Sequence, residues 1–240
     1  MSTKVNLEPS FVLHRTPWRD TSLLIEVFGA VSGRQGLVAK GVRGRRSSRA
    51  ALLQAFQPLL LSWRGRGELH TLTDAEPGGK VFPLLGTALI SGFYLNELLV
   101  RLLQRHDPHP ELFHSYQLTL ARLQLGEQLE WSLRLFECQL LEQLGYGLIL
   151  GHNALDGEPI APMEDYVYVP ERGPIPAGHA EGIPIHGRSL LALSEGQWPL
   201  DEAAPETLRE AKQLLRYSLA SQLGPKPLAS RGLFQSMGSK

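Results

Sequence analysis

The chain has 240 residues, 42% of them hydrophobic and 20% charged, and its 24 Lys and Arg are balanced by 24 Asp and Glu. This is the composition of an ordinary globular protein, and the balance excludes a protein that coats nucleic acid through an overall basic charge. The single cysteine, Cys138, excludes an internal disulfide and a Cys-rich zinc site. The first residues lack the apolar stretch of a signal peptide, and polar residues interrupt the apolar segment 82–103, so we expect a cytoplasmic protein with no membrane role.

The charge is unevenly distributed along the chain. Residues 1–80 carry twelve basic and six acidic side chains, and the stretch from 34 to 66 has no Asp or Glu at all. The basic residues in that stretch are Arg34, Lys40, Arg43, Arg45, Arg46, Arg49, Arg64 and Arg66. Arginine binds phosphate in bidentate geometry and stacks on bases, so an anionic polymer is favoured as the ligand over a merely solvated loop.

The same first third of the chain predicts a small β-barrel. Its short apolar or alternating runs are separated by Gly, Ser and Arg, which is typical of strands joined by turns. The predicted strands are Phe11–His14, Leu23–Phe28, Gly36–Gly41, Pro58–Trp63 and Gly67–Asp74. Five strands with long basic loops are typical of the OB fold, whose exposed face binds oligonucleotides, while the periodicity alone also fits an SH3-like barrel.

After Gly78 and Gly79 the pattern becomes helical. Apolar residues at three and four spacing predict helices over 84–105, 111–125, 127–144, 205–223 and 228–236. The Gly- and Pro-rich stretch between them predicts an irregular subdomain with one strand, Tyr166–Val169, and one short helix near Ser189–Leu193. We therefore expect an α+β protein with an OB domain at 1–80, a helical domain at 81–145, the irregular subdomain at 146–204, and C-terminal helices at 205–240 that complete the helical domain.

No common catalytic motif is present. The sequence lacks a P-loop, HExxH, GxSxG and CxxC, which excludes the usual signals of NTPases, zinc proteases, esterases and zinc fingers. A metal-dependent nuclease would need gathered carboxylates. The candidates are Glu164 with Asp165, Asp201 with Glu202, and Asp156 with Glu158, but their polar surroundings favour a solvated surface. We expect no catalytic residue, no metal and no cofactor, and we expect Cys138 to be a buried small hydrophobe.

Trp18 is the aromatic residue with the strongest claim to a binding role. It lies in the turn-like segment HRTPWRD among basic residues, where an exposed ring could stack on a base while arginines hold phosphates. A core position is the alternative, and for Trp63, on the apolar face of a predicted strand, core is favoured.

Several longer segments carry a family resemblance. In the barrel region they are FVLHRTPWRDTSLLIEVF, SGRQGLVAKGVRGRRS and LLQAFQPLLLSWRGRGELHTL, and further on they are SGFYLNELLVRLL, LRLFECQLLEQLGYG and KPLASRGLF. In this order they resemble the RecO family of bacterial recombination and repair mediators, over nearly the whole chain.

The resemblance implies an OB domain, a helical domain and no catalytic chemistry. It implies that the protein binds single- and double-stranded DNA and anneals strands coated by the single-stranded DNA-binding protein SSB. It also implies that the protein acts together with RecR to load RecA. It would place DNA contacts on the eight basic residues between 34 and 66. Some relatives carry a four-cysteine zinc module after the GYG segment, but this chain has no cysteine there, so the metal should be absent.

The resemblance also implies a site for the acidic, apolar C-terminal tail of SSB, which needs a basic residue beside an apolar pocket. Our prediction for it is Arg134 with Leu133 and Phe136, although for the two apolar side chains a place in the helical core is favoured. Two other functions stay open at this point: an RNA-binding OB protein, because the same patch would bind either polymer, and a metal-dependent nuclease.

Overall fold

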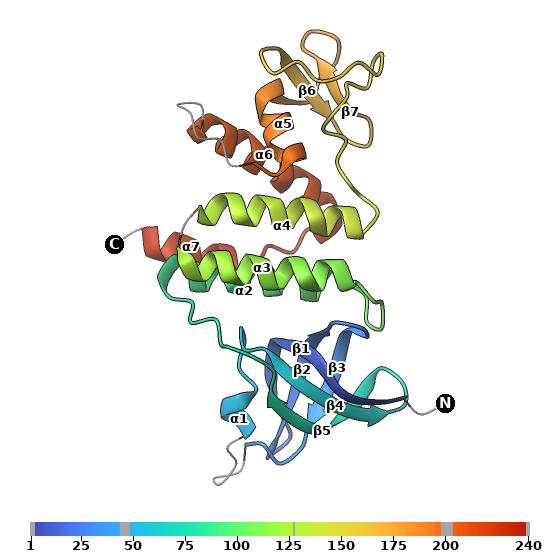
Figure 1. Ribbon diagram of the computed structural model, residues 1–240, viewed down its shortest axis with the longest axis vertical. Helices are drawn as coiled ribbons and strands as arrows, with labels where there is room; N and C mark the ends of the chain where they lie inside the picture. Colours follow the sequence, from blue (N-terminus) through green and yellow to red (C-terminus); the bar gives the residue numbers. More distant parts are fainter. Residues whose placement is uncertain (1–2, 44–48, 127, 198–203, 239–240) are drawn as a thin grey trace. The chain divides into compact units, whose positions relative to one another are not determined.

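The computed structural model of the protein describes residues 3–43, 49–126, 128–197 and 204–238, without the side chains of Arg49 and of residues 235–238. The chain forms two compact units (Figure 1). Unit 1 consists of residues 1–126 together with 227–240, and unit 2 consists of residues 127–226. None of the described helices is long and apolar enough to cross a membrane.

Unit 1 contains a closed five-stranded barrel, which confirms the OB-type prediction. The strands are β1 (Thr3–Trp18), β2 (Ser22–Gly29), β3 (Gly33–Ala39), β4 (Leu59–Gly65) and β5 (Leu69–Pro77), and the short helix α1 (Arg49–Leu52) precedes β4. They pair in the order β1-β2-β3-β5-β4, with β3 and β5 parallel and the other pairs antiparallel. Alternate apolar residues of each strand, with Trp63 among them, fill the barrel.

The first strand is much longer than its predicted core of Phe11–His14. Its first half pairs with β4 and its second half with β2. Register shifts between Val5 and Glu8 and between Val12 and His14 bend it, so that one strand serves both sides of the barrel. The segment before Phe11 alternates poorly because of these bulges, which is why its sequence did not predict a strand.

Unit 1 contains three further helices, of which the first two pack against the barrel and the third packs on the first. They are α2 (Gly86–Leu102), α3 (Pro110–Leu125) and α7 (Ala229–Gly238). Phe11 and Phe28 point out of the barrel and pack edge-on against Tyr116 of α3, at centroid distances of 5.2 and 6.4 Å. Asn96 of α2 donates to the carbonyl oxygen of Leu13 and accepts from the Tyr116 hydroxyl, at 3.0 and 2.6 Å, so this buried polar link is satisfied.

The last helix packs along α2, and a carboxylate of α2 caps its first turn. Glu97 of α2 accepts hydrogen bonds from the backbone N–H groups of Ala229 and Ser230, at 2.8 and 2.9 Å, and from the Ser230 hydroxyl at 2.7 Å. The first N–H groups of a helix have no partner within it, so the carboxylate caps α7. The same three bonds hold the pKa of Glu97 below its ordinary value against the opposing effect of burial.

Unit 2 is built from two longer helices and a small sheet. Its elements are α4 (Leu129–Gln143), β6 (Asp165–Val169), β7 (Gly173–Pro176), β8 (Ile183–His186), α5 (Gly187–Glu195) and α6 (Ala204–Leu223). The sheet has the order β7-β6-β8, so the two strands absent from the prediction are its edges. Both contain proline, which is tolerated at sheet edges and makes their sequences, GPIP and IPIH, look like loops.

The compact units divide the chain differently from the expected domains. Helices α2 and α3 belong with the barrel, whereas α4 and α6 belong with the small sheet. The predicted helix 84–105 ends at Leu102, because the residues after it run alongside the barrel instead.

Candidate nucleic-acid interface

The outward face of β2 and β3 is the surface on which OB folds bind oligonucleotides, and here it is divided into two halves. Glu26, Arg34 and Gly36 form one half, which the segment after α2 covers. We call it the sealed half. Leu24, Val38 and Lys40 form the other half, which we call the free half, and their side chains are half-buried or exposed.

The sealed half is closed by residues 105–107. The N–H of His106 donates to the carbonyl oxygen of Arg34 at 2.9 Å, so this segment continues the sheet beside the start of β3. A Cβ on Gly33 would lie 1.9 Å from the carbonyl oxygen of Asp107, and one on Gly36 would lie 2.9 Å from the guanidinium carbon of Arg105. The two glycines are therefore what allows the segment to approach so closely.

An ion cluster around a buried carboxylate, with two half-buried arginines, holds the seal in place. Glu26 is 9% exposed and pairs with Arg34 at 3.3 Å and also with Arg105. Arg34 donates a further hydrogen bond to the carbonyl oxygen of Val100, at 2.9 Å. Burial lowers the pKa of Arg34, and the charge of Glu26 opposes that effect. Arg34, predicted as a DNA contact, thus joins the barrel to α2.

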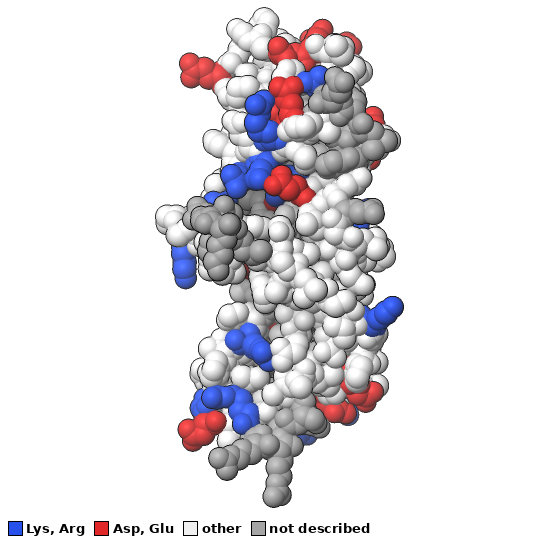
Figure 2. Space-filling model, turned by 90° about the vertical axis from the view of Figure 1, so that its left-hand side faces the viewer, with Lys and Arg blue, Asp and Glu red and all other residues white. Residues whose placement is uncertain are grey.

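Around the free half lie Trp18, Arg19, Lys40 and Arg43, which we call the Trp18 cluster. All four are exposed, and Trp18, at 38%, is the one exposed aromatic side chain in the described part of residues 3–79. The N–H of Arg43 donates to Thr21 at 2.9 Å and its guanidinium donates to the carbonyl oxygen of Arg19 at 3.2 Å, so the loop after β3 lies against the β1–β2 turn. Figure 2 shows blue side chains over the lower part of the barrel, with a red one beside them.

A second basic group lies at the other end of β1. Lys4 and Arg64 are exposed and directly opposite each other in the register of β1 and β4, and Arg66 follows in the β4–β5 turn. We call these three residues the Lys4 cluster. Arg64 and Arg66 were predicted as DNA contacts. Lys4, like Arg19 in the Trp18 cluster, was not, because it lies outside the acid-free stretch and on a strand segment that the sequence did not predict.

Three other predicted DNA contacts lie outside this description. Arg45 and Arg46 are beyond the described residues, and of Arg49 only the backbone, at the start of α1, is described. Their role as contacts stays a prediction.

The residues predicted to bind the SSB tail lie inside unit 2. Arg134 of α4 is 6% exposed and pairs with Glu137 at 2.6 Å, while Leu133 and Phe136 are 6% and 1% exposed. The three side chains therefore present little surface to a peptide. A tail site there stays a prediction, and it would require Arg134 to leave Glu137.

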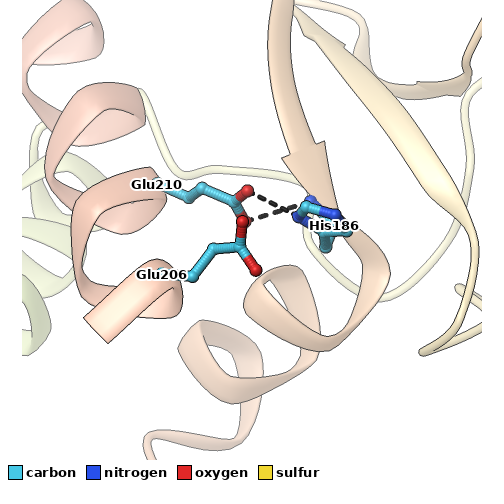
Figure 3. A group of neighbouring side chains, drawn as sticks. All are labelled: His186, Glu206 and Glu210. Carbon is cyan, nitrogen blue, oxygen red and sulfur yellow. Dashed lines mark hydrogen bonds and ion pairs between the residues drawn. The ribbon is translucent and has the colours of Figure 1, made fainter. Parts of the chain in front are cut away.

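One cluster in unit 2 has the residue types of a metal site. His186 at the end of β8 and Glu206 and Glu210 of α6 place a nitrogen and two carboxylate oxygens within 4.8 Å of one another (Figure 3). Each group already has protein partners: Glu210 accepts from the N–H and ring of His186 and from the Ser189 hydroxyl, and Glu206 pairs with Arg188 and Arg209. Glu210 is thus fully engaged by residues at the start of α5, and the neighbouring arginines supply the positive charge that a cation would bring.

Of the three carboxylate pairs predicted for a nuclease, Asp201 and Glu202 lie outside the described residues, Asp156 and Glu158 are exposed, and Glu164 and Asp165 lie at the small sheet. Asp165 lies 3.3 Å from the imidazole of His186, and Glu164 accepts from the Tyr166 hydroxyl at 3.3 Å. Both carboxylates are exposed and take part in the packing around the small sheet. Cys138 is half-buried where a buried position was expected, and burial raises the pKa of its thiol to about 12, so little of it is thiolate at neutral pH.

Comparison with known proteins gives consistent matches over nearly the whole chain. Residues 3–79 match the family model for the recombination protein O N terminal, and residues 86–232 match the model for the recombination protein O C terminal. A protein of Nitrosococcus oceani is 50% identical over 236 residues, which cover 98% of this chain and 94% of that one. A protein of Methylococcus capsulatus is 48% identical over 234 residues, which cover 98% of this chain and 95% of that one. A protein of Coxiella burnetii is 45% identical over 234 residues, which cover 97% of this chain and 99% of that one. All three proteins are named DNA repair protein RecO.

Proposed function

Because the chain belongs to the RecO family, we propose that it is a DNA-binding protein of recombinational repair, which works without catalysing a reaction of its own. The observation that carries the proposal is the exposed basic surface of the barrel. Among the described residues, Lys40, Arg64 and Arg66 are exposed and have no acidic partner within 4.0 Å. Unpaired cations of this kind suit a polyanion.

The mechanism we propose is charge neutralisation and proximity. Two complementary strands repel each other through their phosphates, and cations that neutralise both backbones at once reduce that repulsion. Holding the strands together then turns a bimolecular encounter into a local search. No bond is made or broken in this scheme, so it needs neither a cofactor nor a metal.

We further propose the partners that the family resemblance implies. SSB would present the coated strands and be engaged through its C-terminal tail, and RecR would act with this protein to promote RecA loading onto single strands. Because bacterial DNA lies in the cytoplasm, we propose that compartment as the place of action.

The test is annealing of two complementary oligonucleotides, each coated with SSB from the same organism, in the absence of nucleotide and metal. We expect the protein to accelerate annealing, and we expect replacement of Lys40, Arg43, Arg64 and Arg66 by Gln to remove the acceleration. A matched control replaces Arg122, Arg172, Arg209 and Arg216, four exposed arginines outside the barrel, by Gln. Absence of acceleration by the unmodified protein, together with a strong preference for RNA over DNA, would replace this proposal with the RNA-binding alternative.

A further inference from the structure

The two exposed basic clusters of the barrel differ in chemistry and in place. The Trp18 cluster combines cations with an exposed ring at the end of β1, whereas the Lys4 cluster, at the start of the same 16-residue strand, has cations and no aromatic side chain. In Figure 1, β1 begins at the right of the barrel, where Lys4 pairs with Arg64 near the end of β4, and Trp18 lies at the opposite end of β1. The clusters are therefore at separate places on one barrel.

The barrel order gives the same separation. Lys40 follows β3 and Arg64 lies on β4, and β5 stands between these two strands. The seal adds to it, because Arg105 lies over Gly36, which pairs with Leu69 at the start of β5. Residues 105–107 therefore cover the part of the β2–β3 face that lies between the Trp18 cluster and the β4–β5 turn.

The Lys4 cluster carries an internal electrostatic cost. Residues directly opposite on antiparallel strands have Cβ atoms about 5 Å apart, and like charges at such positions are unfavourable. Lys4 and Arg64 are such a pair. Glu68, the acidic residue in the adjoining turn, lies within 4.0 Å of Arg105 and His106 and so faces the seal. An external anion between Lys4 and Arg64 would relieve the repulsion.

From these observations we infer that the barrel binds two nucleic-acid ligands at once: a single strand at the Trp18 cluster, and the backbone of double-stranded DNA at the Lys4 cluster. The inference rests on the proposed function and divides it between two surfaces. An exposed ring gains from unpaired bases that can stack on it. Point cations without a ring touch phosphates alone, and duplex DNA, with one charge per about 1.7 Å of helix axis, offers them the higher charge density.

The division gives the barrel a role in annealing beyond general attraction. A single strand held through its bases is kept available for pairing, while the newly formed duplex, whose bases are hidden, is retained by the second cluster. Because the duplex product is bound at the Lys4 cluster, the Trp18 cluster is free to bind the next single-stranded segment.

The experiment compares three full-length variants of equal charge change. The first replaces Lys4, Arg64 and Arg66 by Gln, the second replaces Arg19, Lys40 and Arg43 by Gln, and the control replaces Arg122, Arg172 and Arg216 by Gln. Affinity for a labelled poly-dT oligonucleotide and for a blunt duplex of mixed sequence is measured across a salt series.

We expect a double dissociation. The Lys4-cluster variant should lose about tenfold or more in duplex affinity, with a log–log salt slope lower by up to about 0.9 per contact removed, and keep its affinity for poly-dT. The Trp18-cluster variant should show the converse, with a slope on poly-dT lower by up to about 0.7 per contact. Trp18→Ala should weaken poly-dT binding while leaving the duplex affinity unchanged, and Trp18→Phe should restore most of the loss.

The possible failures are distinct. If both triple variants weaken both ligands by the same factor, the barrel has one continuous site and the division is wrong, although the proposed function stands. If neither variant differs from the control, the barrel surface is not the DNA site, and the proposal for the function fails in its structural basis as well.

Discussion

The sealed and free halves of the barrel face share the same two strands but use their arginines and lysines in opposite ways. In the sealed half, Arg34 meets a carboxylate and a backbone carbonyl and becomes part of the fold. In the free half, Lys40 meets neither among the described residues and stays exposed. The role of a basic side chain is thus decided by what the rest of the chain brings opposite it, here by Glu26 of β2 and by the Val100 carbonyl of α2.

The substitution with the largest expected effect on this contrast removes the carboxylate of Glu26, which holds the seal. Glu26→Ala would leave Arg34 and Arg105, both half-buried, beside each other without their shared anion. Removal of one partner from a buried ion pair costs about 3–5 kcal/mol of unfolding free energy, so we expect a loss of that order for unit 1. Urea denaturation measures it, with Glu76→Ala, at an exposed carboxylate, as the control. Equal effects of the two substitutions would mean that the seal does not stabilise the fold.

A second buried pair extends the comparison to unit 2. Arg134→Ala would take the cation away from Glu137, which is 1% exposed, and we expect unit 2 to lose about 3 kcal/mol. Calorimetry should show a lower unfolding temperature, while Arg209→Ala, at an exposed arginine, should leave it nearly unchanged. If Arg134→Ala instead abolishes binding of an SSB tail peptide at unchanged stability, the predicted peptide site is correct.

A smaller effect separates the two halves in DNA binding. Lys40→Gln should lower the salt slope of single-strand binding by up to about 0.7, because one phosphate contact is lost. Arg34→Gln should leave that slope unchanged and lower stability instead. The two substitutions remove one charge each, so they serve as controls for each other, and a slope change with Arg34→Gln would show that the seal opens when DNA binds.

The smallest effect concerns pH at the border of the seal. His70 is buried, with its ring 5.3 Å from that of His106, and burial followed by the charge of His106 lowers the pKa of His70. The unfolded chain therefore takes up a proton at His70 at a higher pH than the folded chain does. Stability of unit 1 should fall as the pH drops below about 6.5, the ordinary pKa of histidine. In His70→Phe this part of the pH dependence should disappear, which denaturation curves at pH 7.5 and 5.5 would reveal, with His179→Phe, at an exposed histidine, as control.

The barrel could be predicted because strand periodicity and turn residues are local signals. Leu23, Ile25 and Val27 alternate with Leu24 and Glu26, and that pattern survives in the structure. The edge strands β7 and β8 could not be predicted, because their prolines are informative only when the partner strand is known. The same holds for Arg34. Its fate depends on Glu26, eight residues away, and on Val100, 66 residues away. Composition identified the basic region, but only tertiary contacts separate its structural members from those left for a ligand.

The cap that Glu97 provides for α7 has a consequence for the order of events during synthesis. The barrel and α2 emerge from the ribosome early, yet the helix that completes their unit begins at Ala229, near the end of the chain. All of unit 2, residues 127–226, is translated in between. Until α7 is synthesised, the carboxylate of Glu97 is solvated by water, and the side of α2 that contacts α7 stays uncovered. A nascent chain can thus finish unit 2 before it finishes unit 1, so the part of the protein that is made first is the last to be completed.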